Sequence, residues 1–107
     1  MPEAGEADRF FESLSSDFDT SAPIRWAFVL SGATEDQVDR LMDAVQKMGF
    51  TEAEPLFDEE QEGHFIVEFA EIRVHTARSF AERVASVEQL AAREGLVMAD
   101  FSAGRPE

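Results

Sequence analysis

The sequence predicts an α+β fold. We expect a ferredoxin-like βαββαβ sandwich, in which two helices cover one face of a four-stranded antiparallel sheet, preceded by one further helix at the N-terminus. Stretches with helical and with strand-like hydrophobic periods follow one another along the chain in this order of elements. Thr34 and Thr76 each stand where a helix cap is expected. A chain of 107 residues has room for one hydrophobic core. These observations predict a single domain over residues 7–102, with flexible tails at 1–6 and 103–107.

An N-terminal helix is predicted from Ala7 onward, because apolar residues recur there every three to four positions. A turn follows, since Pro23 keeps the residue before it out of the helical region. The apolar side of this helix must be buried. We expect it to cover the open face of the sheet, meaning the face opposite the two long helices, and a dimer interface at that face is the alternative. The apolar side consists of Phe10, Phe11, Leu14 and Phe18.

The first strand is predicted at residues 24–30, where both faces are largely apolar, as is typical of an interior strand. Residues 31–32 end it. Thr34 and Gln37 then match a capping box, in which each side chain binds the backbone N–H of the other residue. Gly49 is suitably placed to end this helix in a left-handed conformation. The apolar stripe of the helix consists of Val38, Leu41, Met42, Val45 and Met48.

Residues 50–57 are predicted to form an edge strand, because charged and small residues alternate there and Pro55 has no N–H to donate to a ladder. The residues at 58–63, which we call the acidic turn, lead into a long strand at 64–74. The two patterns together indicate a hairpin whose second strand lies inside the sheet.

A second long helix is predicted to begin after its cap, Thr76, and to end at Gly95. Residues 96–101 are predicted to form the last short strand. In this order of elements the first and third strands are central and the second and fourth are edges, which agrees with their patterning. The buried stripe of the helix consists of Phe80, Val84, Val87 and Ala91.

The composition excludes several functions. The chain has 23 acidic and 9 basic residues, so its formal net charge is −14. A generic nucleic-acid binder is excluded, because such a protein needs cations to replace the counterions of the phosphates, and anionic membrane surfaces are disfavoured for the same reason. Thiolate chemistry is also excluded, since there is no cysteine. No segment approaches the roughly 18 apolar residues of a membrane span, and we expect a cytoplasmic protein.

No reactive centre is evident. The two histidines, His64 and His75, lie at opposite ends of one predicted strand and would be roughly 30 Å or more apart, so they cannot share a metal or a proton relay. We expect His75 to be a loop residue rather than a catalytic base. No serine stands in a known nucleophile motif. We therefore expect no enzymatic activity, no cofactor and no metal.

Negative charge is concentrated in two segments. Residues 1–22 hold six acids and one base, and residues 51–63 hold six acids and no base. A charged edge strand and turn can steer a basic partner toward the protein, although such charge can also serve solubility alone. The candidate protein-binding residues are Asp58, Glu59, Glu60 and Glu62.

A succession of short motifs spans the chain from Arg25 to Ser102. These are Arg25-Trp26-Ala27-Phe28, residues 31–37, Met48-Gly49-Phe50, Glu54-Pro55, Glu62-Gly63 and Val87-Glu88-Gln89-Leu90-Ala91. At this spacing the chain resembles the regulator of ribonuclease activity B family, which are small acidic bacterial proteins. The family's end motif, Tyr-Asp-Gly-Trp, falls at residues 99–102, where only Asp100 matches.

The resemblance implies a ferredoxin-like fold, no catalytic activity, and inhibition of ribonuclease E by contact with its basic, non-catalytic C-terminal region. We therefore expect a regulator that binds a basic protein, with ribonuclease E as the expected partner, as a monomer or weak homodimer without direct contact to nucleic acid. The alternative is a ferredoxin-like module that senses a small ligand as a homodimer.

Overall fold

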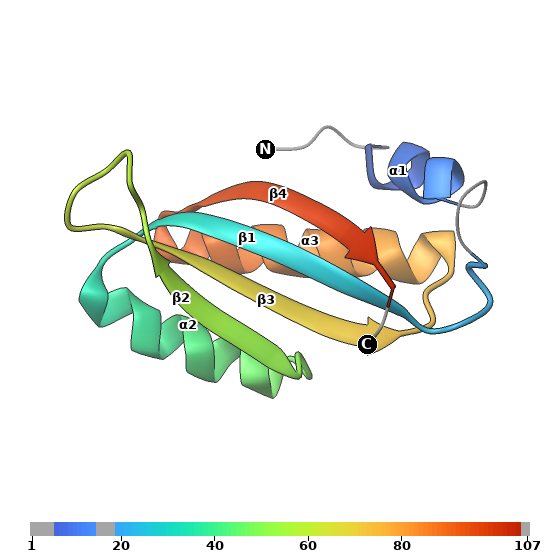
Figure 1. Ribbon diagram of the computed structural model, residues 1–107, viewed down its shortest axis with the longest axis horizontal. Helices are drawn as coiled ribbons and strands as arrows, with labels where there is room; N and C mark the ends of the chain where they lie inside the picture. Colours follow the sequence, from blue (N-terminus) through green and yellow to red (C-terminus); the bar gives the residue numbers. More distant parts are fainter. Residues whose placement is uncertain (1–5, 15–18, 106–107) are drawn as a thin grey trace.

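The computed structural model describes residues 6–14 and 19–105 (Figure 1). Phe18 and the outer parts of the predicted tails, 1–5 and 106–107, lie outside the described residues. No helix within the described ranges is both long and apolar enough to cross a membrane. The elements are α1 (Glu6–Leu14), β1 (Ile24–Ala33), α2 (Glu35–Lys47), β2 (Glu52–Phe57), β3 (Phe65–Arg73), α3 (Ala77–Glu94) and β4 (Val97–Gly104).

The four strands form one antiparallel sheet in the order β2-β3-β1-β4. The predicted α+β fold is confirmed, with β1 and β3 in the centre of the sheet and β2 and β4 at its edges. Pro55 lies on an edge strand, where its missing N–H breaks no ladder between interior strands.

Each long helix begins with a capping box. In α2, the Thr34 Oγ1 accepts a hydrogen bond from the N–H of Gln37, whose Oε1 accepts one from the N–H of Thr34. Thr76 caps α3 in the same reciprocal way. The glycines that follow the two helices, Gly49 and Gly95, have φ angles of +97° and +71°, which side-chain-bearing residues rarely adopt. The predicted starts and ends of both helices are confirmed.

Two strands run further than the sequence predicts. β1 does not end at Gly32 but continues to Ala33, because Gly32, with a φ of +93°, lies at a register shift within the strand rather than in a turn. β4 continues beyond Phe101, and its last two residues, Ala103 and Gly104, pair with β1. Small residues at the end of β4 carry no hydrophobic period, so the sequence did not indicate that they belong to the strand.

The core lies between the sheet and the helices. Trp26, Phe28 and Leu30 of β1 point toward the helices and have no exposed surface. Phe80 of α3 packs over them, with its ring centroid 4.8 Å from that of Trp26 and 6.3 Å from that of Phe28. Because neighbouring residues of a strand point to opposite faces, residues 25, 27, 29 and 31 of β1 lie on the open face.

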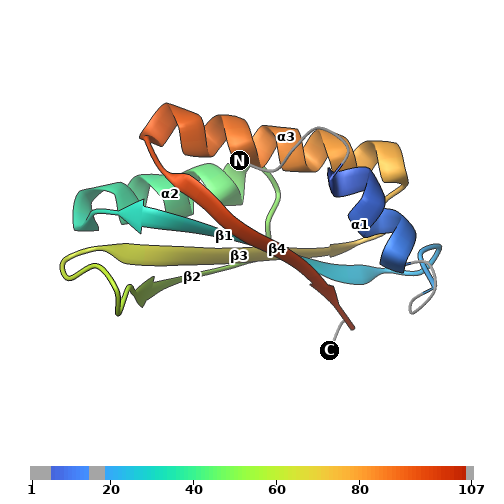
Figure 2. The ribbon, with the colours of Figure 1, turned by 90° about the horizontal axis from the view of Figure 1, so that it is seen from above.

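The prediction that the N-terminal helix covers the open face is wrong. All three described helices lie on the same side of the sheet (Figure 2). The ring of Phe11 stacks on Trp26, with 6.0 Å between centroids, and Phe10 meets Phe101 edge-on at 4.8 Å. The helical side thus offers α1 a cluster of aromatic rings, whereas the open face carries carboxylates, described below, which an apolar helix would have to desolvate.

The position of α1 can be tested at Phe11. We predict that Phe11→Ala lowers the free energy of unfolding by about 1–3 kcal/mol. The effect is smaller than for a fully buried phenylalanine because Phe11 is half-buried. Trp26 is the only tryptophan, and its fluorescence should shift to longer wavelength as water reaches its ring. The matched control is Phe57→Ala, whose side chain is 81% exposed. Equal effects of both variants on urea unfolding would contradict the packing of α1 on Trp26.

Candidate protein-binding surface

The acidic turn connects β2 to β3 and is closed by its first residue. The Asp58 N–H donates to the carbonyl of His64 at 3.1 Å, and the Asp58 Oδ1 accepts from the N–H of Glu60 at 2.9 Å. The side chains of Glu59, Glu60 and Glu62 are exposed. Of the four predicted binding residues, Asp58 therefore also shapes the turn, while the other three present their carboxylates to solvent.

Most carboxylates of β2 and the acidic turn have no cationic partner. Glu52 pairs with Arg25, whose Nε lies 3.0 Å from the Glu52 Oε2. Among the described residues, no Lys, Arg or His lies within ion-pair distance of the other five. The five are Glu54, Asp58, Glu59, Glu60 and Glu62. The structure thus places the predicted charge at one edge of the sheet, and a binding role for these residues stays a prediction.

The strand register extends this charge onto the open face. Glu54 of β2 lies opposite Glu68 of β3, Glu68 lies opposite Val29 of β1, and Val29 lies opposite Asp100 of β4. We call these four residues the acidic row, since they cross the sheet in one line. Like charges directly opposite each other in a ladder are destabilising, so the Glu54–Glu68 pair reduces stability.

Apolar side chains flank the acidic row on the open face. Leu56, Ile72 and Val97 are 41%, 42% and 58% exposed. A surface hollow of about 400 Å³ also opens on this face, and its lining includes the carboxylate-bearing residues Glu54 and Glu68. Within the described chain, the open face therefore combines accessible apolar groups with unpaired negative charge.

Sequence reasoning missed Glu68 and Asp100, because each is isolated in the chain and joins the other acids only through strand pairing. The available signal was the period of two in β3, where Glu68 stands between the buried residues Val67 and Phe69. That period places Glu68 on the face opposite the core but does not reveal its cross-strand neighbours.

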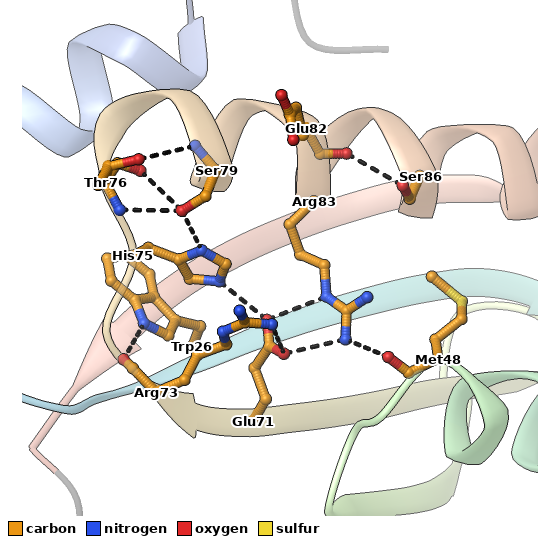
Figure 3. A network of polar contacts seen from close by, with 10 residues as sticks. All are labelled: Trp26, Met48, Glu71, Arg73, His75, Thr76, Ser79, Glu82, Arg83 and Ser86. Atoms are coloured by element: carbon orange, nitrogen blue, oxygen red, sulfur yellow. Dashed lines mark hydrogen bonds and ion pairs between the residues drawn. The ribbon is translucent and has the colours of Figure 1, made fainter.

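A second cluster of ionisable residues is buried on the helical side (Figure 3). Glu71 on β3 is 3% exposed, and its carboxylate accepts hydrogen bonds from the Nε and Nη2 of Arg83 on α3, at 3.0 and 2.9 Å. The same Nη2 donates to the carbonyl of Met48 at the end of α2. The Nη1 of Arg73 lies 3.6 Å from Glu71. This network joins the sheet to both long helices.

His75 belongs to this network. It lies in the loop between β3 and α3, as the sequence predicts, but it is buried rather than solvated. Its Nε2 is 3.0 Å from Glu71, and its Nδ1 is 2.8 Å from the hydroxyl of Ser79. Because a carboxylate only accepts, Nε2 donates to Glu71.

Glu71, His75 and Ser79 are the residue types of a serine hydrolase triad, in which histidine takes the proton of the serine. Here the arrangement is structural. The His75 side chain is only 2% exposed, and the Ser79 hydroxyl already accepts the N–H of Thr76 as part of the cap of α3. Glu71 is neutralised by Arg83 as well. We therefore interpret these residues as a support for the start of α3.

The pKa of Glu71 lies below its ordinary value. Burial is the largest single influence and raises the pKa, but the hydrogen bonds and charges of His75 and Arg83 together lower it by more. A carboxyl group whose pKa falls on folding stabilises the protein above its unfolded pKa, near 4.5, and this stabilisation is lost as the pH falls through the folded value.

We predict that Glu71→Gln lowers the free energy of unfolding by about 3–5 kcal/mol at neutral pH, because Arg83 keeps a partly buried charge without its partner. The difference in the free energy of unfolding between this variant and the unchanged protein should narrow as the pH falls below about 4.5. Urea unfolding at neutral and acid pH measures both effects. The control is Glu68→Gln on the open face of the same strand, which should not destabilise the protein. A loss below about 1 kcal/mol for Glu71→Gln would contradict the role of the network.

Comparison with known proteins places the chain in a family. None of the curated proteins matches it in sequence. A family model described as regulator of ribonuclease activity B matches residues 6–100, from the start of α1 to Asp100 in β4. This range covers most of the chain and includes the acidic turn and the whole acidic row. The protein therefore belongs to the regulator of ribonuclease activity B family.

Proposed function

We propose that this protein is a non-catalytic regulator, similar to inhibitors of ribonuclease E, which alters RNA degradation by contacting a basic region of that enzyme. Membership of the regulator of ribonuclease activity B family supports the ribonuclease as the target. The observation that carries the proposal is the set of unpaired carboxylates on β2 and the acidic turn. Their charge is available to an external cation because no described residue neutralises it.

The position of the acidic turn favours electrostatic steering. In Figure 1 the loop between β2 and β3 extends beyond the end of the sheet. Charges on such a projection meet an approaching partner early, and they accelerate the encounter more than they strengthen the final complex. An Arg-rich segment of a ribonuclease also binds RNA phosphates, so carboxylates that occupy the segment compete with RNA.

The side chains on the helical side that could act in catalysis are already bonded to other groups of the protein, which supports a non-catalytic role. Glu71 and His75 are buried and bonded to each other, and the hydroxyl of the partly exposed Ser79 is engaged by His75 and by the N–H of Thr76. The proposed mechanism therefore needs only binding. The protein occupies basic segments of the ribonuclease and so changes which RNA or protein partners reach them.

The acidic turn can be tested by removing its exposed charge. We predict that Glu59→Gln/Glu60→Gln/Glu62→Gln slows association with ribonuclease E by about 3- to 10-fold at low salt and makes the rate less sensitive to salt. Stopped-flow or surface-based kinetics measure the association rate at about 20 and 200 mM salt. The Debye length is long at the lower concentration and short at the higher one. Asp58 is left in place because it closes the turn.

The matched control is Asp36→Asn/Asp39→Asn/Glu88→Gln, which also removes three charges but from the helical layer. It should change the association rate less than the acidic-turn variant does. An equal effect of both variants would show that total charge, and not the acidic turn, controls the encounter. Absence of any complex between the unchanged protein and ribonuclease E would refute the proposed function itself.

A further inference from the structure

We infer that the open face of the sheet is a docking surface for an extended segment with the pattern basic-x-apolar-x-basic, running across the strands along the acidic row. The inference rests on the proposed function in one respect, namely that the ribonuclease supplies this segment. The acidic turn would then attract the segment, and the open face would hold it.

The first support is that this face is unpartnered. All three described helices pack on the opposite side (Figure 2), and no described element covers the open face. Sheets in small domains commonly bury one face and leave the other to water, but a solvated face is normally polar. Here Leu56, Ile72 and Val97 are all more than 40% exposed. An apolar side chain of a partner can therefore be desolvated on this face.

The second support is the charge of the acidic row. Glu54 and Glu68 lie directly opposite each other, and neither pairs with a cation among the described residues. Arg25, on the same face, is engaged by Glu52. A partner cation placed between Glu54 and Glu68 would convert a repulsive cross-strand pair into two attractive contacts. This complementarity selects a basic occupant.

The third support is spacing. Neighbouring strands lie about 4.8 Å apart, so Asp100 is about 10 Å from Glu68 and about 14 Å from Glu54 across the sheet. In an extended chain, residues i and i+4 point to the same side and are about 13 Å apart. Basic residues at these positions reach the Glu54–Glu68 pair and Asp100 together. The residue at i+2 then lies over Val29, which stands between the acids in the row.

The adjacent row has short side chains at its centre. It crosses the sheet through Glu52, Ala70, Ala27 and Ser102, and Glu52, at the β2 end, is held by Arg25. The charge also argues against a second copy of the chain as the occupant. Two open faces in contact would bring two sets of Glu54, Glu68 and Asp100 together, which is unfavourable in a partly desolvated interface.

The test compares two variants with equal net charge. The open-face variant is Glu54→Gln/Glu68→Gln/Asp100→Asn, and its control is the acidic-turn variant Glu59→Gln/Glu60→Gln/Glu62→Gln. Each removes three negative charges. We expect the open-face variant to raise the Kd for full-length ribonuclease E at least 10-fold, mainly through faster dissociation. The acidic-turn variant should act mainly on association.

A peptide probe tests the pattern without the ribonuclease. One synthetic peptide contains Arg-Ser-Val-Ser-Arg in a Gly/Ser frame, and the other contains the permuted unit Arg-Arg-Ser-Val-Ser with the same composition and charge. We expect the unchanged protein to bind the first peptide at least 5-fold more tightly, and the open-face variant to bind both equally. Equal binding of the two peptides by the unchanged protein would refute the pattern.

The outcomes separate the inference from the proposed function. If ribonuclease E binds the open-face variant as tightly as the unchanged protein, the open face is not the docking surface, although the proposed function stands. If the unchanged protein binds the patterned peptide through the open face but not ribonuclease E, the proposed function fails and the docking surface stands. If it binds neither, both fail. A dimer that sedimentation detects in the unchanged protein but not in the open-face variant would make a second copy the occupant and overturn the inference.

The open-face variant should remain folded. Removing the charges of Glu54 and Glu68 relieves their repulsion, so urea unfolding should give a stability at least equal to that of the unchanged protein. Asp100→Asn retains the side-chain oxygen that accepts the N–H of Phe101. If the triple variant is nevertheless unstable, Asp100→Asn alone serves as the second variant, with an expected loss of 3-fold or more in affinity for the patterned peptide. No change in that affinity would overturn the inference.

Discussion

Side chains on a strand alternate between the two faces of a sheet, and in this protein the alternation separates aromatic rings from carboxylates. On β1, Trp26 and Phe28 face the helices, while Val29 lies on the open face. On β3, Phe69 is buried and Glu68 lies on the open face. All three described helices accordingly pack on the aromatic side, including α1, and the charged side remains uncovered by any described element. The candidate binding surface is thus a consequence of how the core is built.

Glu71 is the exception to this separation, since it is a carboxylate on the helical side. Its burial is compatible with folding because Arg83 and His75 supply hydrogen bonds to both of its oxygens. Arg83 also lies over the ring of Phe50, with 4.1 Å from its guanidinium carbon to the ring centroid. These contacts fix α3 and the end of α2 against β3. The same strand, β3, carries Glu68 of the acidic row on its other face.

Local patterns in the sequence were sufficient for much of the fold. The capping residues Thr34 and Thr76 indicated the helix starts, and the charged, Pro-containing pattern of β2 indicated an edge strand. Features that depend on pairing between distant segments were not predictable in this way. The position of α1 depends on rings contributed by β1, α3 and β4, and the bulge at Gly32 resembles a turn signal when only the sequence is considered.

Only part of the candidate surface could be predicted, because the rest also depends on pairing between distant segments. The run of acids in the acidic turn is visible in the sequence, whereas Glu68 and Asp100 are single residues in otherwise apolar or small surroundings. Their alignment with Glu54 requires the register of three strand pairs, which a shift of one residue would destroy. Glu71, His75 and Ser79 stand four residues apart, but only the turn from β3 into α3 brings their side chains into one line.

Methyl NMR spectra of the protein, alone and saturated with ribonuclease E, test the central claim most directly, because methyl groups lie on both sides of the sheet. Large shifts are predicted for the methyl groups of Val29, Ile72 and Leu56 on the open face, with those of Val45 and Leu90 in the core nearly unchanged. Shifts confined to residues of α2 and α3, with Val29 unaffected, would contradict the claim that the uncovered side of the sheet binds the partner.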